Sequence, residues 1–209
     1  MHPERFHPKN AVRIVTAASL FDGHDASINV MRRILQQHGA EVIHLGHNRS
    51  VAEIVAAAIM EDAQAIAVSS YQGGHNEYFR YLVTLLRERG AGHIKVFGGG
   101  GGVIVPAEIQ ALQAEGVERI YSPEDGRRMG LVGMIEDLLR RADFDVMAEP
   151  TPEWGAGAAG VSDNALARAI TRAEALGHGP EVYAALPRRN PPAPIVGLTG
   201  TGGAGKSSF

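Results

Sequence analysis

Five short apolar runs alternate with longer helical segments across residues 1–142. The runs are almost continuous in apolar residues, as expected for strands that are covered on both faces. The longer segments repeat their apolar residues at about the helical period of 3.6. This alternation is typical of βα units built around a parallel sheet. The expected strands are Val12–Ala18, Glu41–Leu45, Ala65–Ser69, Ile94–Phe97 and Arg119–Tyr121.

Helix boundaries follow the same plan. Gly39, Gly90 and Gly116 each come after the last periodic residue of a segment, where glycine most easily ends a helix. Residues 50–53 read Ser-Val-Ala-Glu, a capping box that opens the second helix, and a last helix covers about Gly126 to Ala142. Five such units most economically form an α/β fold of the flavodoxin-like (Rossmann-like) type. Its five-stranded parallel sheet has the order 2-1-3-4-5, and ligands bind outside the carboxyl ends of strands 1 and 3.

Composition excludes several classes of protein. The formal charge of -3 favours neither nucleic acid nor an anionic membrane surface as a partner. The chain has no cysteine, so no disulfide framework is expected. No apolar stretch approaches the roughly 20 residues of a spanning helix, and the first residues lack the apolar core of a secretory signal. We therefore expect a cytoplasmic protein.

The composition changes after Asp143 to a segment rich in proline and glycine, which predicts a domain boundary. Residues 1–142 would form the first domain and residues 143–194 a linker. One helix is expected inside the linker, from a cap at Ser162 or Asp163 to Leu176, with Gly177 ending it. Residues 195–209 would then begin a second, truncated domain, whose first strand is Ile195–Thr199.

A complete P-loop pattern, Gly-x-x-x-x-Gly-Lys-Ser, follows that last strand directly. Its backbone amides would hold phosphates, Lys206 would reach the β and γ oxygens of a bound nucleotide, and Ser207 would bind Mg²⁺. A chance match is the alternative in so glycine-rich a chain, but the preceding strand and prolines argue against it. Because a P-loop needs its following helix and sheet, we expect no useful nucleotide binding by this chain. The residues of the incomplete site are Gly200, Gly202, Gly203, Ala204, Gly205, Lys206, Ser207 and Ser208.

Three polar or glycine-rich loops fall at the carboxyl ends of the central strands. The first contains Asp22 and His24, a spacing that lets an imidazole bind a metal while the carboxylate holds its other nitrogen. The second covers residues 69–75, and the third is a run of glycines at 98–102. Singly, each loop also fits an ordinary polar turn, a serine-rich helix start or a local adjustment of strand geometry.

The order and spacing of the three loops carry a resemblance. Asp22-x-His24, Ser69-x-Tyr71 and the glycine run resemble the adenosylcobalamin-binding domain of the coenzyme-B12-dependent mutases, whose pattern is Asp-x-His-x-x-Gly, Ser-x-Leu and Gly-Gly. Ser27 and Tyr71 depart from the usual glycine and leucine. Residues 69–75 and the long glycine run are most similar to the fused isobutyryl-CoA mutase family. In that family a B12 domain is joined to a G-protein chaperone domain and a mutase barrel.

The resemblance implies a role for each loop. His24 would replace the dimethylbenzimidazole base as the lower axial ligand of cobalt, the arrangement called base-off and His-on, and Asp22 would hold the other nitrogen of His24. The displaced nucleotide tail would lie along the sheet. Aligning the glycine pair from either end of the run gives Gly98-Gly99 or Gly101-Gly102. The expected cofactor contacts are Asp22, Gly23, His24, Asp25, Ser27, Ser69, Tyr71, Gly73, Gly98, Gly99, Gly101, Gly102 and Ser122.

The resemblance also implies an activity for the parent enzyme, the reversible radical rearrangement of isobutyryl-CoA to n-butyryl-CoA, with GTP and Mg²⁺ used by its G-protein domain. The parent would be a homodimer. This chain would bind the cofactor, contribute no catalytic residue and turn over no substrate alone.

The sequence leaves two alternative functions open. A separate B12 carrier or sensor would share the cobalamin loops, although such proteins usually place a four-helix cap before the domain and only about ten residues precede the first strand here. A response-regulator or flavodoxin-like domain without cobalamin would need acidic residues after strands 1 and 3. Strand 3 instead ends in Ser69-Ser70.

Overall fold

The computed structural model describes residues 6–24, 26–150 and 162–177, together with positions 194, 196, 197, 199 and 201. Asp25, the expected strand at 195–199 and the expected P-loop at 200–208 lie wholly or partly outside the described residues. Among the described residues, no helix combines the length and the apolar character needed to cross a membrane.

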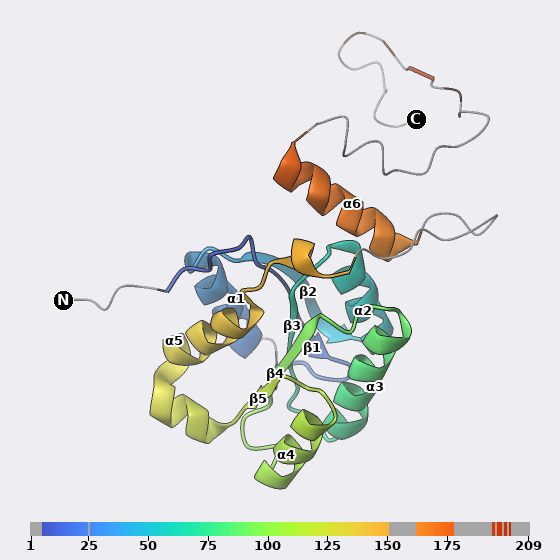
Figure 1. The fold of residues 1–209 in the computed structure, drawn as a ribbon. Coiled ribbons are helices and arrows are strands. Elements are labelled where there is room, and N and C mark those ends of the chain that lie inside the picture. The colour runs from blue at the N-terminus through green and yellow to red at the C-terminus, as the bar shows by residue number, and fades with distance from the viewer. Residues whose placement is uncertain are drawn as a thin grey trace.

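Five parallel strands form one sheet in the order β2-β1-β3-β4-β5, which confirms the predicted topology (Figure 1). The register pairs Ser69 with both Ala18 and Gly99, so β1, β3 and β4 end side by side. This brings the loops after these strands to one edge of the sheet. The strands are β1 (Arg13–Ser19), β2 (Glu41–Arg49), β3 (Ala65–Ser69), β4 (Lys95–Gly99) and β5 (Arg119–Tyr121).

Helices cover both faces of the sheet, with α1 and α5 on one side and α2, α3 and α4 on the other (Figure 1). Each face has its own apolar core. Ile14 and Val15 are adjacent and fully buried, and they belong to different cores because successive strand residues point to opposite faces. The helices are α1 (Ala26–Gln37), α2 (Val51–Met60), α3 (His75–Glu88), α4 (Pro106–Ala114), α5 (Pro123–Ala142) and α6 (Asp163–Leu176), with a 3₁₀ turn η1 (Val146–Ala148).

The predicted helix ends agree with the backbone. Gly39, Gly90 and Gly116 have φ angles of 90°, 69° and 114°, in the left-handed region. The capping box is also present, because the Glu53 backbone N–H donates to Ser50 Oγ while the Ser50 N–H donates to the Glu53 carboxylate. Hydrogen bonds from Ser50 and then from Arg49 lower the pKa of Glu53 to about 2.

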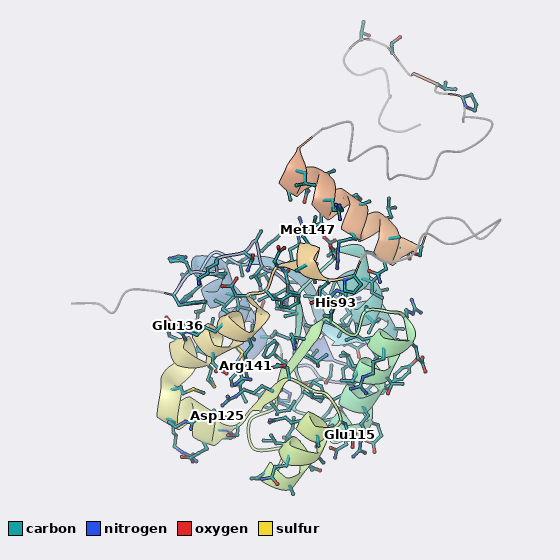
Figure 2. The ribbon with its side chains drawn as sticks, viewed as in Figure 1. His93, Glu115, Asp125, Glu136, Arg141 and Met147 are labelled. Atoms are coloured by element: carbon teal, nitrogen blue, oxygen red, sulfur yellow. The ribbon has the colours of Figure 1, made fainter. Side chains whose placement is uncertain are left out.

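Several boundaries differ from the predictions. β2 continues past Leu45 to Arg49, because a register shift near Gly46 lets Arg49 pair with Ser19 beyond the irregularity. β4 includes the first two glycines of the run. α5 starts at Pro123 and not at Gly126, since Ser122 and Asp125 form a capping box that begins the helix earlier. Figure 2 shows Asp125, Glu136 and Arg141 along this helix.

The predicted linker helix is present as α6, and it packs on α2 (Figure 1). The inner face of α6 carries Arg168, which is 1% exposed and donates from Nε to both oxygens of Asp62 at 2.8 and 3.1 Å. Asn164 also donates to the carbonyl of Gly90, and Arg13 pairs with Glu174 at 2.5 Å. These partners lie at or before the first residues of strands. α6 therefore covers the amino-terminal ends of the strands, at the opposite end of the sheet from the predicted ligand loops.

Candidate functional site

The loop after β1 presents the predicted histidine. The backbone N–H of Asp22 bonds the carbonyl of Ser19 at 3.0 Å, and this turn brings the Asp22 side chain inside, where it is fully buried. Its Oδ1 lies 2.9 Å from His24 Nδ1 and 2.8 Å from the His24 backbone nitrogen. A carboxylate accepts hydrogen bonds, so Nδ1 carries the proton. The His24 side chain is 75% exposed, which leaves Nε2 as the nitrogen that can bind a ligand.

The loops after β1, β3 and β4 are joined by hydrogen bonds, as the register of the strands predicts. The second oxygen of Asp22 accepts a bond from the Tyr71 backbone N–H at 2.6 Å. Ser19 Oγ donates to Ser70 Oγ at 2.9 Å, and the Ser70 N–H donates to the carbonyl of Gly99 at 2.8 Å. The rings of His24 and Tyr71 lie 5.4 Å apart, so the two predicted loops meet.

A cavity of about 200 Å³ opens beside these loops, between the sheet and the helices α1 and α5. Several predicted contacts line it from four separate segments: Ser27, Ser69, Tyr71, Gly98, Gly99, Gly101 and Ser122. The apolar walls of the cavity were not predicted from the sequence, and among them are Met31, Phe97, Met134 and Leu138. Their periodicity indicates that they are buried between the sheet and its helices, but it gives no sign that a cavity remains between them.

Two serine hydroxyls beside the cavity are buried without a hydrogen-bond partner in the described part of the chain. Ser27 Oγ and Ser69 Oγ are inaccessible and have no hydrogen-bond partner among the described residues. Both serines line the cavity. A buried polar atom without a partner costs about 1–3 kcal/mol, so a ligand that hydrogen-bonds here would be favoured over an apolar one. The hydroxyl of Ser122 is already engaged with Asp125 at the start of α5.

The glycines of the run have different surroundings. A Cβ on Gly98 would lie 2.4 Å from Phe79 Cζ, and one on Gly100 would lie 2.0 Å from the Ser70 carbonyl oxygen, so both positions exclude side chains for packing. A Cβ on Gly99 would meet only the carbonyl oxygen of Tyr121, at 3.5 Å. Gly99 shares its strand face with Phe97, which lines the cavity. Its missing side chain therefore keeps the cavity open.

Other predicted contacts lie apart from the cavity. Gly23, Gly73 and Gly102 are exposed, and a Cβ on any of them would meet no atom within 4 Å. Gly102 does not line the cavity, whereas Gly100, in the middle of the predicted glycine run, does. Among the described residues, no three histidine, aspartate or glutamate side chains gather closely enough to hold a metal ion by themselves.

Comparison with known proteins relates this chain to one family. The family model of the B12 binding domain matches residues 12–123. The chain is 62% identical over 204 residues to the fused isobutyryl-CoA mutase of Cupriavidus metallidurans, a match that covers 97% of this chain and 19% of that protein. It is 58% identical over 216 residues to the enzyme of the same name from Geobacillus kaustophilus, covering 98% and 20%. The chain thus spans about one fifth of these relatives.

A shorter relative matches over most of its own length. The chain is 35% identical over 128 residues to the 2-hydroxyisobutanoyl-CoA mutase small subunit of Aquincola tertiaricarbonis, and the match covers 61% of this chain and 92% of that subunit. Among solved structures, a cobalamin-binding protein from Desulfitobacterium hafniense DCB-2 aligns with a TM-score of 0.52 at 22% identity, covering 63% of this chain and 60% of that chain. That likeness shows a shared fold.

Proposed function

Because this chain belongs to the family of B12 binding domains, we propose that it holds cobalamin base-off, with His24 as the axial ligand of cobalt. It would serve as the cofactor module of an acyl-CoA mutase. The observation that carries this proposal is the exposed His24 ring, fixed through Nδ1 by the buried Asp22 and placed beside a cavity with two unpartnered hydroxyls.

The residues present fit a cobalt corrinoid. Because a corrin ring already holds its cobalt, the protein would need to contribute a single donor atom, and the exposed Nε2 of His24 would be that donor. Asp22 fixes the tautomer and the ring orientation of His24, as carboxylates do for metal-bound histidines. Asp22 is itself held by the Tyr71 N–H, so the ring is positioned before any cofactor arrives.

The cavity fits the displaced nucleotide tail. A lower base that has left cobalt carries an aromatic ring and a free nitrogen. When the base is buried, this nitrogen loses its hydrogen bond to water and needs a donor from the protein. Phe97, Met134 and their apolar neighbours can cover the ring, while Ser27 or Ser69 can donate to the nitrogen. Gly99 leaves the space into which the base would fit.

When bound, adenosylcobalamin supplies the cobalt–carbon bond whose cleavage starts radical carbon-skeleton rearrangements. The residues of this chain bind and orient the cofactor, and the hard chemistry belongs to the cofactor. The names of the relatives support isobutyryl-CoA as the substrate of the parent enzyme, and the resemblance implies n-butyryl-CoA as the product. The substrate-binding barrel would lie in the rest of the parent chain, because this chain covers 19% of the Cupriavidus enzyme.

The same proposal divides the chain into a cobalamin-binding domain at 1–142, a linker at 143–194 and the start of a P-loop GTPase domain at 195–209. The parent would be a cytoplasmic homodimer whose G-protein domain uses GTP and Mg²⁺. The P-loop pattern from Gly200 to Ser207 supports that assignment.

A spectroscopic experiment tests the axial ligand. The 209-residue chain is mixed with adenosylcobalamin, and the visible spectrum is recorded for the wild type, His24→Ala and His47→Ala. We expect a base-off, His-on spectrum for the wild type and for His47→Ala, which removes an exposed histidine of β2. In His24→Ala the coordination should be lost. Unchanged coordination in His24→Ala would refute the assignment.

A further inference from the structure

The cavity offers very few polar groups to a ligand. Among the described residues that line it, none carries a charge. The Tyr121 hydroxyl is committed to Asp137 Oδ2 at 2.8 Å, and burial followed by this bond raises the pKa of Tyr121. Ser122 is committed to the cap of α5. The hydroxyls of Ser27 and Ser69 therefore remain as the buried side-chain partners for a ligand, and the partly buried Tyr71 adds a third hydroxyl to the lining.

The nearby backbone adds little. The carbonyl of Gly99 already accepts a bond from the Ser70 N–H, and the carbonyl of Gly100 accepts one from the Val103 N–H. The remaining walls come from Ile28, Met31, Phe97 and similar apolar side chains. The cavity therefore suits a flat, mostly apolar group that carries one hydrogen-bond acceptor.

Corrinoid cofactors differ in the base that ends their nucleotide tail, and these bases make different demands. A detached benzimidazole has one free ring nitrogen, which accepts a hydrogen bond, and is otherwise apolar. An adenine adds an amino group and further ring nitrogens, each of which loses water on burial. A phenolic base has no ring nitrogen, so it leaves the serine hydroxyls without an acceptor.

We propose that this cavity selects the lower base, and that the chain takes a benzimidazole cobamide in preference to a purine or a phenolic one. This inference rests on the proposed cobalamin-binding function. Ser27 and Ser69 supply the donor that a phenol cannot use, and the apolar walls reject the extra polar atoms of a purine.

The test compares dissociation constants of the 209-residue chain for cobalamin, its adenine analogue, its p-cresol analogue and cobinamide, which has no base. Acid titration of free cobalamin and of its adenine analogue measures the cost of detaching each base from cobalt, and these two dissociation constants are corrected for that cost. The p-cresol analogue and cobinamide have no base bound to cobalt and need no correction. After correction, the adenine analogue should bind about tenfold or more weakly than cobalamin, the effect of a buried polar atom without a partner. The p-cresol analogue should bind a few-fold to about tenfold more weakly, because one net hydrogen bond is lost.

Substitution of the serines separates the two causes. In the double variant Ser27→Ala, Ser69→Ala, cobalamin should lose its advantage over the p-cresol analogue, while the adenine analogue stays the weakest. Ser50→Ala, which removes the cap of α2 outside the cavity, is the matched control and should keep the wild-type order. Cobinamide affinity reports on folding, since neither hydroxyl has a base to meet there.

The outcomes distinguish the inference from the function on which it rests. Equal corrected affinities for the three bases, with binding still dependent on His24, would overturn the selection and leave the cofactor role intact. Failure of the wild type to bind any of the four compounds would refute the cofactor role itself.

Discussion

One carboxylate oxygen of Asp22 accepts a hydrogen bond from the Tyr71 backbone N–H at 2.6 Å, across 49 positions of the sequence. The other oxygen holds the ring and backbone of His24. A buried carboxylate is tolerated when several donors surround it, and here these donors belong to the loops after β1 and β3. The position of the histidine is thereby tied to the end of the central strand.

Asp22→Asn should weaken cobalamin binding by ~10–100-fold, as for other groups that orient a metal ligand. Asparagine keeps the shape but has one acceptor oxygen, so its amide group must face either the His24 ring or the Tyr71 N–H. Titration of the visible spectrum measures the affinity, and thermal unfolding measures the loss of stability. Asp145→Asn alters an exposed cap at η1 and should change neither quantity by much. Equal affinities of Asp22→Asn and the wild type would count against the hydrogen bond.

The sheet could be predicted from the sequence because helices cover both faces of its central strands. β3 has the predicted bounds, Ala65–Ser69, and all of its residues are buried. Such strands appear as apolar runs, and alternation with helices then leaves few topologies. The end of β2 was less predictable. Gly46 and the polar residues after it have the composition of a turn, and only pairing with β1 beyond a register shift extends the strand.

The cavity and the docking of α6 could not be predicted in the same way. Met31 and Met134 come from different helices, and the volume left between them depends on side-chain packing across the whole domain. Arg168 lies on a helix of ordinary amphipathic pattern. Its partner Asp62 is 106 positions away, so no local signal marks this arginine as buried.

Alanine substitutions in the glycine run should separate packing from binding. Gly99→Ala should leave the unfolding temperature within a few degrees of the wild type, since its Cβ would meet only the Tyr121 carbonyl oxygen at 3.5 Å. Its cobalamin affinity should fall about tenfold or more, because the methyl group projects into the cavity. Gly98→Ala should instead cost about 1–3 kcal/mol of stability by overpacking against Phe79.

Gly102→Ala is the control for both variants, because its Cβ would meet no atom within 4 Å and the residue does not line the cavity. Cobalamin titration and thermal unfolding should both match the wild type. If Gly102→Ala weakened binding as much as Gly99→Ala, the tail would occupy a different place from the one proposed.

Arg168→Ala should release α6 from α2. The substitution leaves the Asp62 carboxylate buried without its partner, and breaking a buried pair on one side costs about 3–5 kcal/mol. Hydrogen exchange should therefore become faster across Asp163–Leu176 while β1 and β3 stay protected. Arg172→Ala, on the exposed side of the same helix, should change little. Unaltered protection of α6 in Arg168→Ala would mean that the ion pair does not hold the helix.

The docking of α6 should also weaken as the pH falls below about 6.5, through His93. This residue lies beside Arg168, with Nε2 of the imidazole 3.5 Å from Nη2 of the guanidinium, at the end of the fold that faces α6 (Figure 2). Burial, and then the positive charge of Arg168, lower the pKa of His93 from its ordinary value of 6.5. Once α6 has left, His93 no longer lies beside the charge of Arg168, so its pKa rises toward the ordinary value and the undocked state takes up a proton first as the pH falls.

The direction of the pH effect on α6 docking follows from this difference in the pKa of His93. The contribution of His93 to docking is complete above pH 6.5 and is lost as the pH falls through the lowered value. Glu149 and Asp62 act in the opposite direction on the pKa of His93, but their effects are smaller than those of burial and of Arg168. Hydrogen exchange of α6, corrected for intrinsic rates and compared at about pH 7.5 and about pH 5.5, should show faster opening at the lower pH. His93→Gln should remove most of this change. If the variant kept the full pH dependence, another group would have to be responsible.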